Sequence, residues 1–198
     1  SVTLANATSR TYCYDANGSR VAEKTAEDAA PANCETGPDR TYDWDVRDTL
    51  VRASVGGTVV GNYDYDAYGQ RVWRRTADDD VDYQLDDDFV LRETSDETGY
   101  TAYTRRYHYA DEPLAVTNDF GTPATHWFSN DAQGSPSDEL NGTSVAAIRK
   151  YDAWGQYEDG TAPGVTEPKL GYTGHQYDPE TGLTYARARY YDAKNGVF

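Results

Sequence analysis

A five-residue pattern recurs along this 198-residue chain and limits the folds open to it. An aromatic residue precedes an aspartate, and a glycine follows the aspartate three positions later. The copy at residues 44–48 has Asp48 in the glycine position, and a degenerate copy lies at 130–134. The aromatic, acidic and glycine positions of the better copies are Tyr14, Asp15 and Gly18; Trp44 and Asp45; Tyr65, Asp66 and Gly69; and Tyr151, Asp152 and Gly155. A pattern that recurs in this way predicts a repeated structural unit.

Each copy has the composition of a hairpin turn. An aspartate side chain accepts hydrogen bonds from backbone N–H groups of its own turn, and glycine adopts the positive φ that closes it. The aromatic residue ends the incoming strand and packs on its neighbours. Because Asp48 replaces this glycine, one of two outcomes is expected: Asp48 adopts the left-handed conformation, or its turn is of a different type. Asp45 and Asp66 lie 21 residues apart, a spacing too short for two helices and suited to strand–turn–strand.

The segments between the turns have strand character. Leu50–Val55 and residues 71–76 follow two of the turns and are predicted strands. Alternation of side chains predicts strands at Tyr103–Tyr109 and at residues 184–191. The predicted shared faces are Tyr103, Arg105, Tyr107 and Tyr109 in the first, and Tyr185, Arg187, Arg189 and Tyr191 in the second.

Tyrosine replaces much of the usual aliphatic core. Hydrophobic residues make up only 37% of the chain, but its 18 tyrosines each bury an apolar ring and keep a hydroxyl for a polar partner. Helix-like composition is confined to residues 22–30 and 144–150, and the first is better interpreted as a surface loop. We therefore predict an all-β fold of repeated antiparallel β-hairpins that form a continuous, spiralling sheet, within one domain over residues 1–198.

The C-terminal residues resemble a known family. The string at 171–192 is similar to the end of the Rhs repeat-associated core domain, and the upstream pairs resemble the family's YD repeats. The resemblance implies YD repeats over 10–110, with a cysteine-containing loop near 22–38, and a core segment over 111–198. It rests on Tyr172, Gly174, Tyr177, Asp178, Gly182, Arg187, Arg189, Tyr190, Tyr191 and Asp192, together with the turn residues given above.

Membership of the Rhs/YD-repeat family would imply a sheet of long hairpins that spirals into a hollow shell. In bacterial Rhs and toxin-complex C proteins such a shell encloses a C-terminal toxin, and in teneurins it is an extracellular adhesion scaffold. The bacterial core usually continues into an Asp-Pro-x-Gly segment, where autoproteolysis frees the toxin. That segment is expected downstream of Phe198. We therefore predict a secreted or surface-exposed structural scaffold with no enzyme activity within these residues.

The length of the chain leaves two further hypotheses. A closed shell takes several times more chain than 198 residues, so we expect an open strip whose edges are covered by the remainder of a longer Rhs chain or by other copies. The absence of methionine also indicates a piece of something longer. A self-assembling filament or adhesin is the second hypothesis. A carbohydrate-binding surface that uses Trp73, Trp127 and Trp154 on a cell-surface glycan is the third.

The net charge of −16 excludes some partners. So acidic a chain repels phosphate backbones and anionic lipids, and we therefore expect neither nucleic-acid binding nor membrane insertion. No apolar run approaches the length of a membrane span. Cys13 and Cys34 could form a disulfide, which would suit an extracellular protein, or remain as two free buried thiols.

No residue pattern in the chain predicts catalysis. His108, His126 and His175 lack the context of an activated nucleophile, and no ligand spacing suits zinc. Clustered carboxylates could hold Ca²⁺, although solvated loop charge is the favoured interpretation. We predict no other cofactor. The calcium candidates are Asp78, Asp79, Asp80, Asp86, Asp87 and Asp88.

Overall fold

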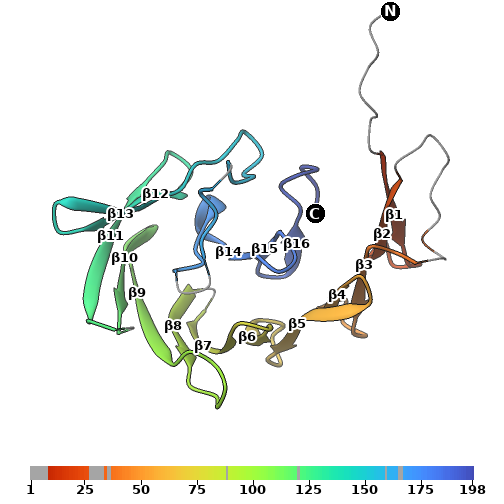
Figure 1. The fold of residues 1–198 in the computed structure, drawn as a ribbon, viewed down its shortest axis with the longest axis horizontal. Helices are drawn as coiled ribbons and strands as arrows, with labels where there is room; N and C mark the ends of the chain where they lie inside the picture. Colours follow the sequence, from red (N-terminus) through yellow and green to blue (C-terminus); the bar gives the residue numbers. More distant parts are fainter. Residues whose placement is uncertain are drawn as a thin grey trace, which may run out of the picture. The chain divides into compact units, whose positions relative to one another are not determined.

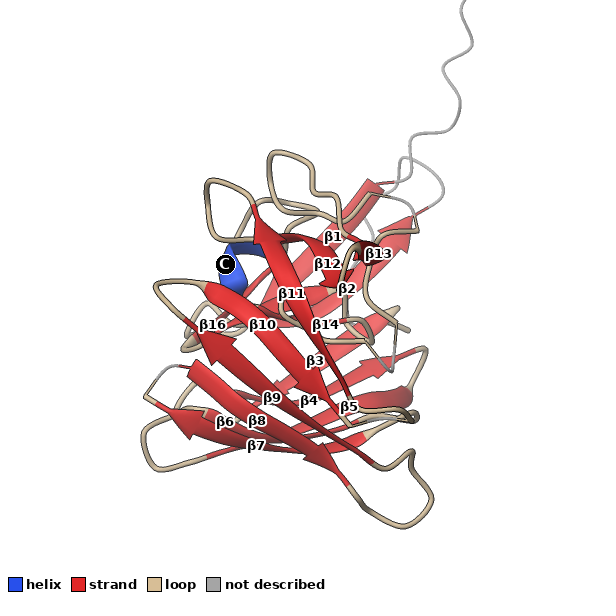
Figure 2. Ribbon diagram, turned by 90° about the vertical axis from the view of Figure 1, so that its left-hand side faces the viewer, coloured by secondary structure: helices blue, strands red, loops and turns tan. Residues whose placement is uncertain are grey.

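The computed structural model describes residues 9–26, 34, 37–87, 89–119, 121–158, 160–164 and 167–198. Strands dominate these residues, and their one helical element is the 3-10 turn η1 at Tyr172–Gly174 (Figure 2). No helix of the described chain has the length and hydropathy needed to cross a membrane. The strands are β1 Ser9–Tyr14, β2 Arg20–Ala26, β3 Arg40–Trp44, β4 Leu50–Val55, β5 Thr58–Tyr65, β6 Arg71–Arg75, β7 Asp80–Asp86, β8 Phe89–Ser95, β9 Tyr103–Tyr109, β10 Pro113–Asn118, β11 Ala124–Asn130, β12 Pro136–Asn141, β13 Ser144–Ile148, β14 Gln176–Asp178, β15 Leu183–Ala186 and β16 Arg189–Tyr191.

The first thirteen strands form one antiparallel sheet whose order follows the chain from β1 to β13. Short turns allow consecutive strands to pair in this way, because an antiparallel neighbour needs no crossover. β1 and β13 are the two edges of this order, so the sheet is not closed. The strands β14, β15 and β16 form a second, three-stranded sheet. The predicted all-β hairpin fold is confirmed.

Strand β9 confirms the alternation predicted from its sequence. Tyr103, Arg105 and Tyr107 are at most 5% exposed, whereas Arg106 and His108 face solvent. The predicted strands at Leu50–Val55 and 71–76 are also present, as β4 and β6.

The interpretation of residues 184–191 as one strand is wrong. β15 ends at Ala186 and β16 begins at Arg189, with a turn between them. Arg187 takes a φ of 63°, and Tyr185 pairs with Tyr190 across the hairpin instead of sharing a face with Tyr191. Alternation alone cannot reveal a two-residue turn. The helix-like composition at 144–150 likewise yields β13, because pairing with β12 overrides local propensity.

The chain divides into two compact units, residues 1–63 and 64–198. In the first unit, β1 and β2 pair, and a disulfide joins Cys13 of β1 to Cys34 beyond β2, with 6.2 Å between the Cα atoms. Because β2 extends to Ala26, it includes the start of the loop predicted near 22–38. Residues 27–33, 35 and 36 of that loop lie outside the described residues. The prediction of one continuous domain stays a prediction.

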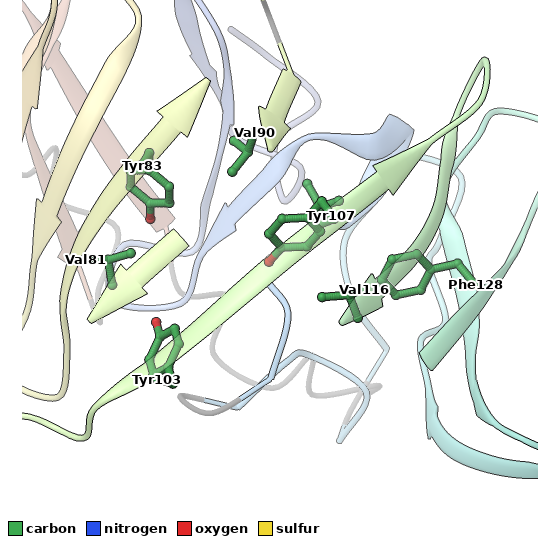
Figure 3. Packing of buried hydrophobic residues seen from close by; sticks show 8 residues of the cluster. Val81, Tyr83, Val90, Tyr103, Tyr107, Val116 and Phe128 are labelled. Atoms are coloured by element: carbon green, nitrogen blue, oxygen red, sulfur yellow. The ribbon is translucent and has the colours of Figure 1, made fainter. Parts of the chain in front are cut away.

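In the second unit, β6 to β13 curve around the C-terminal segment that contains η1 and β14 to β16 (Figure 1). The core lies on the concave face of these strands, where tyrosine rings and aliphatic side chains pack together (Figure 3). Leu170, which precedes η1, belongs to the same cluster, so the C-terminal segment completes the core. The buried cluster is Val81, Tyr83, Val90, Tyr103, Tyr107, Val116, Phe128 and Leu170.

Candidate functional site

The repeat turns share one hydrogen-bond arrangement. In the turn after β5, Oδ1 of Asp66 accepts the backbone N–H groups of Tyr68 (2.8 Å) and Gln70 (2.9 Å). The backbone N–H of Gly69 donates to the Asp66 carbonyl at 3.1 Å. The same bonds recur around Asp15, Asp45, Asp131 and Asp152. Each aspartate therefore closes its own turn.

Two of these turns have special features. Asp48 adopts a φ of 58°, so its turn keeps its type and the aspartate takes the left-handed conformation. Gly155 has a φ of 86°, and a Cβ atom there would lie 2.3 Å from Cδ1 of Tyr172. Gly155 is therefore needed for its backbone conformation and also for the close approach of the tyrosine ring.

Asp178 belongs to the same tyrosine–aspartate pattern, but its carboxylate points into the protein. Its Oδ2 accepts Nη1 of Arg71 at 2.5 Å, and its Oδ1 accepts Nη2 at 3.0 Å. Oε1 of Gln176 also accepts Arg71 Nη2, at 2.6 Å. Thr181 closes the Asp178 turn instead, because its N–H and hydroxyl both donate to the Asp178 carbonyl. Asp178 and Arg71 are only 1% and 2% exposed.

The electrostatics of this pair favour the charged forms. Burial alone would lower the pKa of Arg71, but the adjacent Asp178 carboxylate outweighs it and raises the pKa well above its usual value. The guanidinium also lies 4.4 Å from the centre of the Tyr185 ring. Arg71 therefore stays protonated in the core and holds β6 to the C-terminal segment.

Further buried arginines line the same face. Arg74 contacts Asp79 at 2.6 Å and Glu180 of the C-terminal segment at 3.0 Å. Two more pairs are Arg105 with Glu93 and Arg149 with Glu139, the latter at 2.9 Å. Buried pairs of this kind add little net stability, but they are costly to break and so fix which segments meet.

Lys169 adds a fifth buried cation to this region. Its Nζ donates to the carbonyls of Gly164 (2.5 Å) and Glu167 (3.1 Å). Desolvation lowers the pKa of Lys169 to about 8, and the nearby Arg74 guanidinium acts in the same direction. The amine is thus held by backbone carbonyls within the segment that precedes η1.

The calcium candidates that the structure describes do not converge. Asp79 contacts Arg74, while Asp80 contacts Arg75 and accepts the indole N–H of Trp73 at 2.6 Å. Asp86 and Asp87 follow at the far end of β7, and Asp88 lies outside the described residues. Within the described part of the chain, no three His, Cys, Asp or Glu side chains are grouped to hold a metal ion.

The histidines and tryptophans are likewise dispersed. His108 contacts Thr117, and His175 contacts Thr173, each at 2.9 Å. His126 contacts Glu139 at 2.5 Å. Trp127 and Trp154 are 50% and 62% exposed and lie on separate elements, β11 and the turn after β13, whereas Trp73 is partly buried. None of these side chains forms a catalytic set with another.

Sequence reasoning missed the arginine network. Arg71 and Asp178 are 107 residues apart, and Arg74 and Glu180 are 106 apart. The only local signal was arginine in strands that are otherwise rich in aromatic residues, and this signal does not indicate which carboxylate each arginine contacts.

The comparisons with known proteins agree with this fold. A family model described as Teneurin YD-shell matches residues 3–198. The chain belongs to the teneurin YD-shell family. It is 30% identical over 195 residues to the tRNA3(Ser)-specific nuclease WapA of Bacillus spizizenii, a match that covers 93% of the chain and 7% of that protein. It is 27% identical over 164 residues to the probable deoxyribonuclease RhsB of Dickeya dadantii, which covers 79% of the chain and 11% of RhsB. The predicted resemblance to Rhs proteins is confirmed, and this YD-shell chain spans only a small part of these relatives' length.

Solved structures show the same fold. A chain in the crystal structure of TcdB2-TccC3-Cdc42 superposes with a TM-score of 0.63 at 16% identity, over 94% of this chain and 12% of that chain. A chain in the structure of the Photorhabdus luminescens Tc holotoxin pore gives a TM-score of 0.58 at 15% identity, over 93% and 11%. At this identity the likeness concerns the fold of the YD-shell segment alone.

Proposed function

We propose that this YD-shell segment is wall material of a larger exported protein, which encloses or presents a C-terminal effector, and that it has no catalytic activity of its own. The observation behind this proposal is the pairing of Arg71 with Asp178 and Gln176. The concave face of the sheet binds a later part of its own chain through buried polar contacts. A wall that holds the chain on its inner side is suited to retaining an effector joined to the end of that chain.

Three further observations support this role. The matched relatives are named nucleases, yet the chain corresponds to 7% to 11% of their length. The buried arginines Arg71, Arg74 and Arg149 pair with carboxylates of the same chain, which is a structural use of these charged groups. The disulfide between Cys13 and Cys34 is typical of an oxidising compartment, which agrees with export.

Protease protection in the full-length protein tests the proposal. We expect the downstream effector to resist a protease that digests the same effector when it is produced alone. The purified segment should also leave tRNA and DNA intact under conditions in which the full-length protein cleaves its substrate. An effector digested equally fast in both forms, or nuclease activity in the segment, would contradict the proposal.

A filament is a second candidate, because β13 ends the sheet order and is apolar on its exposed side. Val145 and Ile148 are 54% and 51% exposed, and among the described strands β13 pairs only with β12. An open edge of this kind can pair with another strand. Sedimentation over a range of concentrations, with electron microscopy, should then show growing fibres that Val145→Lys abolishes. A monodisperse monomer at high concentration would eliminate this candidate.

A further inference from the structure

A cavity of about 210 Å³ opens in the second unit, between the β7–β8 turn, the β9–β10 loop and the C-terminal segment. A cavity of only about 10–15 Å³ is enough for a single water molecule, so this one can take an organic group. Its wall is largely apolar. Phe89 and Tyr109 pack with ring centres 4.8 Å apart, and Val90, Leu170 and Tyr185 continue the same surface.

The rim of the cavity is acidic. Asp87, Asp111 and Glu112 line it and are exposed, and none of the three forms a salt bridge to any described residue. By contrast, the buried carboxylates of Glu93, Glu139 and Asp178 in this unit each contact an arginine. Arg187 also lines the rim, with its guanidinium 5.7 Å from the centre of the Phe89 ring. Arg71 also lines the cavity, but Asp178 neutralises it, so three carboxylates against Arg187 leave an excess of negative charge.

A buried amide gives the cavity a directional group. Gln176 lines the cavity and is only 6% exposed. Its Oε1 accepts Nη2 of Arg71, which fixes the orientation of the amide, and its Nε2 makes no hydrogen bond to the described residues. The Nε2 donor of this cavity-lining residue is available to an acceptor, such as a carbonyl oxygen of a ligand.

Backbone strain accompanies these features. Four non-glycine residues of the described chain have positive φ, and three of them line this cavity: Asp87 (52°), Thr173 (52°) and Arg187 (63°). They belong to separate loops. The left-handed conformation is especially unfavourable for a β-branched residue such as Thr173. Strained residues of this kind cluster at ligand-binding sites, because the surrounding structure holds them in place for binding.

We infer that this cavity binds a lysine or arginine side chain of a peptide. The apolar wall would contact the methylene stem, the rim carboxylates would pair with the cation, and Nε2 of Gln176 would donate to a peptide carbonyl. This inference goes beyond the wall function proposed above and is independent of it, because a peptide from any source would present the same groups.

Titration of the full chain with short blocked peptides tests the inference. Acetyl-Gly-Arg-Gly-amide and acetyl-Gly-Lys-Gly-amide are added while the protein amide resonances are followed by NMR. Saturable shifts should map to the cavity. Acetyl-Gly-citrulline-Gly-amide, which has nearly the same shape as the arginine peptide without its charge, should bind at least tenfold more weakly. Equal binding of the arginine and citrulline peptides, or no saturable shift, overturns the inference.

A matched pair of variants separates the cavity from general charge attraction. The double variant Asp111→Asn/Glu112→Gln should weaken arginine-peptide binding about tenfold. Asp96→Asn/Glu97→Gln changes the net charge equally in another exposed Asp-Glu pair, in the β8–β9 loop, and should leave binding unchanged. An equal loss in both overturns the inference. If the first double variant does not unfold cooperatively, Glu112→Gln alone replaces it.

Discussion

Asp66 and Asp178 both follow a tyrosine and both begin a turn that contains a glycine, but their carboxylates have different partners. Asp66 is partly exposed and accepts two N–H groups of its own turn. Asp178 is buried and binds Arg71, while Thr181 closes its turn. The sequence pattern thus determines that a turn forms. The partner of the carboxylate then depends on whether another residue can close the turn and whether a cation lies opposite.

The largest expected effect comes from making the same substitution at both sites. Asp178→Asn should lower the free energy of unfolding by about 3–5 kcal/mol, because it leaves the buried Arg71 without its anion. Asp66→Asn should cost less than about 1 kcal/mol, since the carboxamide oxygen still accepts both N–H groups. Urea denaturation of the two variants measures both values. Similar losses of unfolding free energy at the two sites would show that the two carboxylates contribute equally to stability.

A double variant checks the cause of the Asp178 effect. Arg71→Met/Asp178→Leu removes both charges at once and should recover most of the stability lost in Asp178→Asn. If the double variant is as unstable as the single one, the loss arises from packing and not from an unpaired charge.

The turn aspartates have a smaller expected contribution. Asp131→Ala removes the acceptor of the Gln133 and Ser135 N–H groups and should cost about 1–2 kcal/mol. Asp138→Ala on β12 is the control. This half-buried carboxylate makes no hydrogen bond or salt bridge to the described residues, so its loss should stay within about 0.5 kcal/mol. Thermal unfolding monitored by circular dichroism compares the two. A loss in Asp138→Ala equal to that in Asp131→Ala would contradict the turn assignment.

Asp48 tests the backbone component of the same turns. Asp48→Gly should stabilise the protein by about 0.5 kcal/mol, because glycine takes the observed φ of 58° without strain. The reciprocal variant Gly69→Asp places an aspartate at a φ of 83° and should destabilise by about 1 kcal/mol. Both midpoints can be read from the same denaturation series. A less stable Asp48→Gly variant, or a more stable Gly69→Asp variant, would refute the strain argument.

The smallest effect is expected at acid pH. Partial desolvation would raise the pKa of Asp45, but hydrogen bonds from the backbone N–H groups of Thr49 and Arg47 lower it to about 2. Its stabilising contribution is therefore complete above the ordinary aspartate pKa of about 4 and is lost as the pH falls from about 4 to about 2. Asp45→Asn should flatten this part of the stability profile. If the free energy of unfolding of Asp45→Asn falls between about pH 4 and about pH 2 as steeply as that of the unaltered protein, Asp45 is not the group responsible.

The sequence was sufficient for features that are local. The turn residues and the strands β4, β6 and β9 follow from short patterns, because their hydrogen bonds or alternation involve near neighbours. The hairpin at Arg187 was missed because tyrosine and arginine alternate straight through the turn. The outcome at Asp48 stayed open because aspartate tolerates both conformations.

The candidate site could not be predicted to the same extent. Asp178 was recognised as a member of the pattern. Its glycine, Gly182, comes four positions later and not three, but this spacing does not identify the partner of the carboxylate. Its partner, Arg71, comes from a strand that is adjacent only after the chain has folded. The cavity has the same origin, since its walls come from five segments that are separated in the sequence.

Gly155 limits how freely this family's turns can diverge. At Asp48 the turn keeps its form with a side chain in the left-handed position, so an asparagine or aspartate could arise at Gly69, where a Cβ atom meets nothing within 4 Å. At Gly155 any Cβ atom would overlap the ring of Tyr172. Over evolutionary time, substitutions should therefore accumulate at turn glycines such as Gly69, where a side chain has room. Selection should remove them at residue 155, because glycine there is required by the ring of Tyr172, seventeen positions later.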